Sequence, residues 1–401
     1  MSYLEHRTSF TALRTLDTLP SAASPPEEAR REPSAAPAVR PVEFSIVSPT
    51  LNERENIAAL VQGIERAMGD AAWELIVVDD NSPDGTAELV RDLHCTDGRV
   101  RVLKRIGRRG LASACLEGWL ASSAPYLAVI DADGQHDPGM LPALFGPLKE
   151  GRADLVVASR YAKGASISDW ERRRAQHSRI ATKITLELIP TGTTDPMSGF
   201  FALRREVMED AAPRISGRGF KILLEILVAS ARPIRMREVP ITFRPRVNGA
   251  SKMSSPVIWD WLTLVVEGAT RGAVSPRLFT YLSVGTAGLL VQLLVAAVLF
   301  RGAGLPFQAA QAVAVLSAVI SNYSLNTWLT FADRRRTRWT WASGLLAFTM
   351  VCGSGAAANW LLADFMFKAG APWLLAAAAG AAVASVLNYV ATSRVSPRSR
   401  R

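Results

Sequence analysis

The last third of the chain, from Leu278 onward, is apolar over lengths that suit a lipid bilayer. It contains four largely apolar segments, near 278–300, 307–331, 341–367 and 372–393. Each is about 20 residues long or longer, which is enough for a helix to cross ~30 Å of hydrocarbon. We therefore predict an all-α membrane domain of four transmembrane helices over residues 278–394, which excludes a wholly soluble or fibrous protein.

The charges beside these segments predict which ends face the cytoplasm. One arginine cluster lies between the second and third segments and another follows the fourth, whereas the two remaining loops carry only Arg301 and Lys368. The clusters are Arg334, Arg335, Arg336 and Arg338, then Arg394, Arg398, Arg400 and Arg401. Because positively charged loops stay inside, we expect an integral protein of the cytoplasmic (inner) membrane with both termini in the cytoplasm. Residues 395–401 would form a basic cytoplasmic tail.

Composition narrows the class of partner. The formal charge of +10 suits anionic lipid, a phosphate substrate or nucleic acid, and the apolar C-terminal third favours lipid over nucleic acid. Only three cysteines are present, too few and too scattered for a disulfide framework, which indicates a reducing compartment. Residues 1–41 are rich in Pro, Ala, Ser, Glu and Arg and lack the apolar core of a signal peptide, so we interpret them as a disordered tail.

Residues 42–255 show short β-rich runs separated by segments of helical length. The predicted strands are Phe44–Ser48, Glu74–Asp79, Val100–Lys104, Tyr126–Asp131 and Asp154–Ser159. Strands that alternate with helices indicate an α/β domain with a doubly wound, mostly parallel, Rossmann-like sheet. Ligands of such sheets bind beyond the carboxyl ends of the strands, which points to the loops after Val47, Val78 and Ile130.

The segment between the first two strands has the clearest helical pattern. Its apolar residues, spaced three or four apart, are Ile57, Leu60, Val61, Ile64 and Met68. Asn52 followed by Glu55 three residues later resembles a capping box, so we expect the helix to begin there.

Two acidic side chains follow the fourth strand in the run Asp131-Ala132-Asp133-Gly134-Gln135. Carboxylates one residue apart at a strand end can hold a hard divalent ion, Mg²⁺ or Mn²⁺, that also bridges a diphosphate. Such pairs elsewhere are more often solvated turns, and the position after a buried strand favours the metal here.

The loop after the second strand can be interpreted in two ways. Asp79-Asp80-Asn81-Ser82-Pro83-Asp84-Gly85 has the composition of a turn and helix start, and Asp80 could equally accept hydrogen bonds from a nucleoside. The first loop, 48–56, lacks the Gly-x-Gly-x-x-Gly pattern, which argues against a dinucleotide-binding oxidoreductase.

Together these stretches resemble the GT-A glycosyltransferases of family 2, and four later motifs narrow the resemblance to the polyprenyl-phosphate (dolichyl-phosphate) mannosyltransferases. The motifs are Ser159-Arg160-Tyr161, Asp195-Pro196-Met197-Ser198-Gly199-Phe200-Phe201, Phe220-Lys221-Ile222-Leu223-Leu224-Glu225 and Arg246-Val247-Asn248-Gly249-Ala250-Ser251-Lys252. More loosely, Ser321-Asn322-Tyr323-Ser324-Leu325-Asn326 resembles the GtrA-like four-helix membrane family. One departure is Gly110-Leu111-Ala112, where the family often has Gly-Leu-Gly.

The resemblance implies a role for each matching position. The donor nucleotide sugar would be bound by Pro49, Leu51, Glu53, Val78, Asp80, Ala132, Gln135, Arg246 and Lys252. The metal ligands would be Asp131, Asp133 and Gln135, and the acceptor phosphate would be held by Arg160, Arg174 and Ser178. The basic cluster at 172–174 is also compatible with a solvated or lipid-facing surface.

Two apolar stripes could lie on the membrane surface. The first is Ile180, Ile184 and Leu188, and the second, within a predicted interfacial helix at 256–277, is Val257, Trp261, Leu264 and Val265. Packing against the protein core is the alternative for both, and the tryptophans favour the membrane for the second.

The function implied is inverting transfer of one hexose, mannose from GDP-mannose, to polyprenyl phosphate at the cytoplasmic face. Alternatives are UDP-glucose or a UDP-aminosugar as donor, a processive polysaccharide synthase, and a lipid-linked sugar flippase or scaffold. The nearest match to the synthase motif Gln-x-x-Arg-Trp is Gln176-His177-Ser178-Arg179-Ile180, which lacks the tryptophan. Homo-oligomerisation is left open by the sequence.

Overall fold

The computed structural model describes residues 41–167, 180–189, 192–215, 217, 221–244, 255–330 and 338–395. Nearly all of the predicted N-terminal tail and of the basic C-terminal tail lies outside the described residues.

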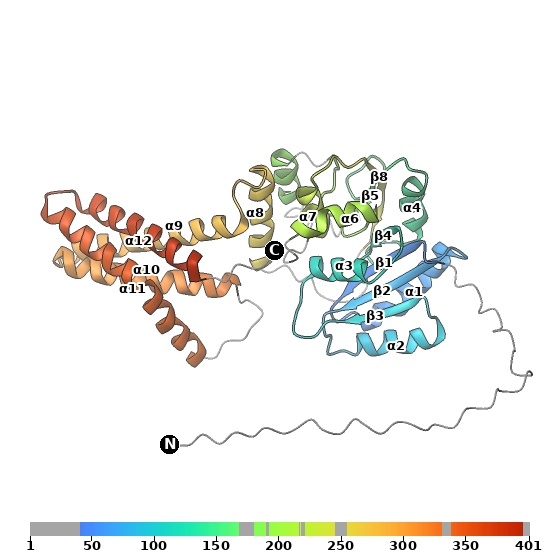
Figure 1. Cartoon of the computed structure of the whole chain (residues 1–401), viewed down its shortest axis with the longest axis horizontal. Helices are drawn as coiled ribbons and strands as arrows, with labels where there is room; N and C mark the ends of the chain where they lie inside the picture. The colour runs from blue at the N-terminus through green and yellow to red at the C-terminus, as the bar shows by residue number, and fades with distance from the viewer. Residues whose placement is uncertain are drawn as a thin grey trace, which may run out of the picture. The chain divides into compact units, whose positions relative to one another are not determined.

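The N-terminal domain is built on a seven-stranded sheet with the order β3-β2-β1-β4-β7-β5-β8 (Figure 1). Its strands are β1 (Phe44–Thr50), β2 (Trp73–Asp79), β3 (Val100–Lys104), β4 (Tyr126–Val129), β5 (Leu155–Ser159), β7 (Phe201–Arg204) and β8 (Met236–Pro240). Only β7 runs antiparallel to its neighbours. A small parallel pair is formed by β6 (Ser166–Ile167) and β9 (Thr242–Phe243). The predicted mostly parallel α/β sheet is confirmed.

Helices cover both faces of this sheet, as its nearly continuous apolar strands require. One face packs against α1 (Arg54–Met68), α2 (Thr86–Thr96) and α4 (Leu141–Lys149). The other packs against α3 (Leu111–Leu120), α6 (Arg205–Ala211) and α7 (Ile222–Ala229). Short 3₁₀ turns at Pro138–Met140 and Ala212–Arg214 adjoin α4 and α6.

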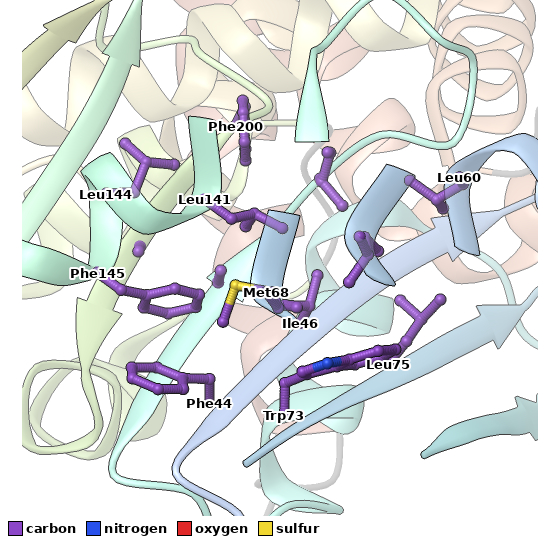
Figure 2. Packing of buried hydrophobic residues seen from close by; sticks show 14 of the residues in the cluster. Phe44, Ile46, Leu60, Met68, Trp73, Leu75, Leu141, Leu144, Phe145 and Phe200 are labelled. Atoms are coloured by element: carbon purple, nitrogen blue, oxygen red, sulfur yellow. The ribbon is translucent and has the colours of Figure 1, made fainter. Parts of the chain in front are cut away.

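The first core includes the helix whose spacing was clearest in the sequence. All five of its predicted apolar residues are buried. Leu60 and Met68 of α1 belong to one buried cluster with Ile46 and Leu75 of the sheet and Phe145 of α4, in which Figure 2 shows Met68 beside Ile46. Burial of side chains of this size contributes roughly 1.5–3 kcal/mol each.

The predicted capping box at the start of α1 is wrong. The N-cap is Glu53, without a side-chain cap, and Asn52 adopts a left-handed conformation with φ of 59°. The exposed amides are satisfied by the neighbouring loop instead: Glu53 N–H donates to Thr86 Oγ1 at 3.2 Å and Arg54 N–H to Asp84 Oδ2 at 3.1 Å. Side chains about 30 residues further along the chain therefore take the place of a capping side chain within α1.

The C-terminal region is entirely helical where it is described. Its helices are α8 (Ser255–Ala269), α9 (Pro276–Ala296) with a π-helical extension Ala297–Gly302, α10 (Phe307–Thr330), α11 (Arg338–Lys368) and α12 (Trp373–Val395). Among the described residues, Pro276–Gly302 and Trp341–Lys368 are long and apolar enough to cross a bilayer, and Trp373–Asn388 is a shorter apolar stretch. Four spans therefore stay a prediction.

The two predicted surface stripes differ. Ile180, Ile184 and Leu188 are exposed, as a lipid-facing stripe would be. In the second stripe, Val265 is buried, and Trp261 and Leu264 pack with it against Ile189 and Leu224. For these three residues the alternative, packing against the protein core, is what the structure shows. Trp261 also donates a hydrogen bond to Thr185 Oγ1 at 3.1 Å.

The C-terminal helices repeat one packing contact in two hairpins. Gly288 of α9 lies against Asn322 of α10, and Gly355 of α11 lies against Asn388 of α12, so closely that a Cβ at either glycine would clash with the asparagine. Four residues beyond each glycine stand Gln292 and Asn359, which hydrogen-bond to each other with Asn359 Nδ2 and Gln292 Oε1 2.9 Å apart. Gln311 of α10 donates to the same asparagine at 3.2 Å. Paired amides of this kind join helices in an apolar setting.

Candidate active site

The candidate site lies at the carboxyl-terminal edge of the sheet, between β1 and β4. The chain proceeds from β1 outward to β3 and then returns to place β4 on the other side of β1, so the loops after β1 and β4 diverge. Such a switch point creates a crevice at the sheet edge. Because β5 runs parallel to β4, the loop after Ser159 reaches the same edge.

The loops after β1 and β2 form one unit that carries the predicted donor residues. Pro49 and Val78 are partners in the β1–β2 ladder, and Asp80 N–H donates to Thr50 O at 3.0 Å. Asn52 N–H donates to Ser82 Oγ at 2.9 Å. The loop that contains Leu51 and Glu53 is therefore bonded to the loop that contains Asp80.

Asp80 is buried and is paired with an arginine that the sequence interpretation missed. Arg105, the first residue after β3, donates from Nε to Asp80 Oδ1 at 2.7 Å. Gly110 N–H donates to the other carboxylate oxygen at 2.8 Å. Burial raises the pKa of Asp80, and the hydrogen bonds from Gly110 and Arg105 oppose that rise. The carboxylate is thus fixed in position at the end of β2.

The acidic loop after β4 places its two carboxylates differently. Asp133 is buried, and its Oδ1 accepts a hydrogen bond from Gln135 N–H at 3.1 Å. The Asp131 side chain is about one-third exposed, at 32%. Ala132 is buried between them, and Arg244 N–H donates to Gln135 O at 3.1 Å, which ties the loop to the segment after β9.

Gly199, in the motif before β7, leaves room for the Asp131 carboxylate. A Cβ at this position would lie 2.3 Å from Asp131 Oδ2. A side chain at this position would force the Asp131 carboxylate to move, so the glycine lets that carboxylate keep its place in the acidic loop.

The oxygen atoms of the acidic loop suit a hard divalent cation, whose remaining ligands would come from a diphosphate. Two carboxylates and the Gln135 amide supply oxygen, the ligand type that Mg²⁺ and Mn²⁺ prefer. The described residues hold no group of three or more His, Cys, Asp or Glu that could bind a metal. Gly199 keeps the Asp131 side of that site clear.

His136 next to this loop is unsuited to act as a base at neutral pH. It is buried between Phe200 and Phe243, with ring centroids 5.3 and 5.4 Å away. Burial and the positive charge of Arg160 lower its pKa to about 3. Its Nε2 lies 3.8 Å from Asp131 Oδ2. The neutral ring serves as a packed wall behind the acidic loop.

Arg160 is fixed by a two-point contact with Asp195. Its Nε donates to Oδ2 at 2.7 Å and its Nη2 to Oδ1 at 2.8 Å, while its backbone N–H also reaches Oδ2 at 3.1 Å. Burial disfavours the charge on Arg160, but the hydrogen bonds and charge of Asp195 outweigh this cost and raise its pKa. A bidentate pair of this kind fixes the guanidinium plane.

A second cation, Lys221, lies near Arg160 at the start of α7. Its Nζ donates to Met197 O at 3.3 Å, in the same motif as Asp195 and Gly199. Burial, then repulsion by Arg160, lowers the pKa of Lys221. The 195–199 motif therefore contacts Asp131, Arg160 and Lys221 at once.

The remaining predicted ligands cannot be placed. Arg174, Ser178, Arg246 and Lys252 lie outside the described residues. For the described positions, the structure brings the loops after β1, β2, β4 and β5 to one edge. The role of Asp195 was missed because its partner lies 35 residues away, whereas Arg105 could have been suspected from its place directly after a predicted strand.

Both domains of the chain resemble known protein families. The model of Glycosyl transferase family 2 matches residues 45–211, and that of the GtrA/DPMS transmembrane domain matches residues 280–396. The dolichol-phosphate mannosyltransferase of Pyrococcus furiosus is 33% identical over 88% of this chain and 99% of its own length. The polyprenol monophosphomannose synthase of Mycolicibacterium smegmatis is 36% identical over 58% of this chain and 90% of its own.

Among solved structures, the glucosyl-3-phosphoglycerate synthase of Mycobacterium tuberculosis, in complex with Mn²⁺, UDP and glucosyl-3-phosphoglycerate, is also similar. It matches 56% of this chain and 80% of its own, with 25% identity and a TM-score of 0.42. The resemblance inferred from the sequence motifs is confirmed by the match to the Pyrococcus enzyme, which extends through both domains. The chain is a membrane protein and a glycosyltransferase, and it belongs to the dolichol-phosphate mannosyltransferases of glycosyltransferase family 2.

Proposed function

We propose that this enzyme transfers one mannose from GDP-mannose to a polyprenyl phosphate at the cytoplasmic face of the membrane. The observation that carries the proposal is the convergence of three loops at one sheet edge: the Asp80 loop, the Asp131–Gln135 loop and the Arg160 loop. The relatives' names supply the sugar and the lipid class.

The donor would lie across the switch point. Its nucleoside would contact Pro49, Leu51, Glu53, Val78 and Asp80, which the β1–β2 pairing holds together. Its diphosphate would extend towards the acidic loop after β4. Arg246 and Lys252 are the predicted contacts to the donor phosphates.

Asp131, Asp133 and Gln135 would hold a divalent cation, Mg²⁺ or Mn²⁺. Bound there, the ion would neutralise the charge that develops on the leaving diphosphate. The partly exposed position of Asp131 and the buried position of Asp133 would present one carboxylate to the crevice and anchor the other in its turn.

The acceptor would be held as an anion by Arg160 together with Arg174 and Ser178. A phosphate monoester has a second pKa of about 6, so it is largely ionised near neutral pH and needs no strong base. This agrees with the pKa of about 3 at His136, which makes that side chain too weak a base for the reaction. An oxygen of the acceptor phosphate would form the new bond to the anomeric carbon while the bond to GDP breaks on the opposite face, which inverts that centre.

The protein's own contribution would be positioning and charge. Asp195 fixes Arg160 in one plane, and Gly199 keeps Asp131 accessible, so the two substrates meet in a prearranged geometry. The membrane helices would cross the bilayer four times, with both termini cytoplasmic, and would bring the lipid phosphate to the catalytic domain.

A nucleotide-sugar panel tests the proposal. The full-length enzyme in detergent would be given radiolabelled GDP-mannose, UDP-glucose or a UDP-aminosugar, each with Mg²⁺ and a short polyprenyl phosphate. We expect label in the lipid fraction from GDP-mannose and far less from the others. Transfer from a uridine nucleotide alone would keep the reaction class and replace the donor.

A further inference from the structure

Arg105 is a fully buried, positively charged residue of the catalytic domain that has no part in the proposed chemistry. It follows β3 directly, and its N–H donates to Asp79 O at 2.8 Å, which continues the sheet by one step. Its side chain is completely buried. Burying a guanidinium group costs free energy of folding unless its nitrogens are paired. The contacts of Arg105 therefore indicate its role.

All three guanidinium nitrogens have partners around Asp80. Nε and Nη2 both reach Asp80 Oδ1, at 2.7 and 2.5 Å. Nη2 also donates to Gly110 O at 2.8 Å, and Nη1 donates to Ser113 Oγ at 2.7 Å and Glu117 Oε1 at 3.2 Å. Arg105 thereby joins the end of β2 to the start of α3.

Gly110 closes this arrangement into a ring. Its carbonyl accepts from Arg105, and its N–H donates to Asp80 Oδ2 at 2.8 Å. The φ of 136° at Gly110 is one that a residue with a side chain rarely adopts. Ala112, the nearby residue that departs from the family pattern, lies in the first turn of α3, is buried in the core and leaves the ring intact.

Within this ring the Asp80 carboxylate can still accept a hydrogen bond from a ligand. An ionised carboxylate can accept about four hydrogen bonds. Among the described residues, Arg105 contacts Oδ1 with one hydrogen bond and one ion pair, and Gly110 N–H donates one hydrogen bond to Oδ2. Oδ2 therefore keeps the capacity to accept from an N–H group beside it. Guanine and uracil both present such an N–H group.

We propose that Arg105 is a positioning residue for the donor, which keeps Asp80 oriented to accept a hydrogen bond from the nucleobase of a nucleoside diphosphate. This inference rests on the proposed function, because it assumes that Asp80 contacts the donor. Arg105 itself touches Asp80 and the Gly110 loop and would act through them.

The test is a double-mutant cycle on the full-length enzyme, with dissociation constants of GDP and of UDP measured in Mg²⁺. Arg105→Lys keeps a positive charge and loses the planar fork, and Asp80→Asn loses the carboxylate. We expect each to weaken binding of the cognate nucleotide about 10- to 100-fold. The double variant should be little worse than either single one, because the two residues act as a unit.

Two further readouts separate positioning from general loss of structure. The Michaelis constant for polyprenyl phosphate should stay within about twofold in Arg105→Lys, whereas that for the donor should rise. Arg101→Lys is the matched control: Arg101 lies on β3, the strand that Arg105 follows, pairs with Glu74 and has a side chain that is 42% exposed. It should leave both constants unchanged.

Each outcome decides something different. If Asp80→Asn weakens nucleotide binding and Arg105→Lys does not, or if the two effects multiply in the double variant, the role of Arg105 is overturned and the donor site stands. If Asp80→Asn has no effect, the donor assignment itself fails. Should Arg105→Lys not fold, Ser113→Ala with Glu117→Gln removes the arginine's α3 partners; unchanged donor binding there would also overturn the inference.

Discussion

Asp133 is the residue on which the proposed metal site depends most directly. Asp133→Asn removes a charged oxygen ligand but keeps an oxygen that can accept from Gln135 N–H, so the turn should survive. We expect transfer to fall roughly 100-fold or more, with an unchanged melting temperature. The control is Asp137→Asn, in an exposed side chain that pairs with Arg244. Near-normal activity of Asp133→Asn in Mg²⁺ and Mn²⁺ would remove Asp133 from the metal site.

Asp80 should make nucleotide binding sensitive to acid. Burial raises its pKa above the ordinary value of 3.8, so the carboxylate takes up a proton at a higher pH than an exposed aspartate does. Protonation removes the charged acceptor, and GDP affinity should therefore fall as the pH drops through this raised pKa. Titration of GDP binding from pH 8 to pH 4 would show the step in the natural enzyme. The same step in Asp80→Asn would assign it to another group, such as the nucleotide phosphate.

At the scale of elements, the 195–199 motif joins the parts of the site. Gly199→Ala would place a methyl group 2.3 Å from Asp131 Oδ2, so the carboxylate must move. We expect weaker Mn²⁺ binding and a loss of transfer of about tenfold or more, measured by calorimetry and by product formation. Gly146→Ala in α4, where a Cβ meets nothing within 4 Å, is the matched control. Unchanged Mn²⁺ affinity in Gly199→Ala would show that the motif does not shape the metal site.

Elements were predicted from the sequence where the pattern was local. Strand runs and the apolar face of α1 follow from side-chain periodicity, and both are present in the structure. The start of α1 and the contacts of α8 could not be read in this way, because Thr86, Asp84, Ile189 and Leu224 complete them from distant parts of the chain.

The candidate site follows the same rule. A parallel sheet brings the carboxyl ends of its strands to one edge, so the strand pattern alone predicts that Asp80, Asp131 and Asp133 lie near one another. The pairing of Arg160 with Asp195 and of Asp80 with Arg105 depends on loop paths that spacing does not specify.

At the scale of the whole molecule, catalysis and membrane attachment should be separable. A chain that ends at Ser275 keeps α8, which packs on the catalytic domain, and lacks α9 to α12. We expect it to bind GDP with Mg²⁺ and to glycosylate a short, detergent-soluble polyprenyl phosphate. Its activity on long-chain lipid in vesicles should fall much further, because tethering to the bilayer raises the effective concentration of the two partners.

One outcome would contradict the separation of catalysis from membrane attachment. A truncated protein that is folded and binds GDP yet transfers nothing to the short acceptor would mean that the membrane helices build part of the site. Within the described helices, the buried amides Gln292, Gln311 and Asn359 already bond to one another or to backbone, which fits a role in joining the two hairpins.

The most direct test of the central claim is the mass of the lipid product made by the full-length enzyme in vesicles from GDP-mannose, Mg²⁺ and polyprenyl phosphate. We predict one product, the polyprenyl phosphate plus a single hexose, with GDP released in equal amount. A ladder of products with two or more hexoses, or GDP release without any glycosylated lipid, would contradict the account.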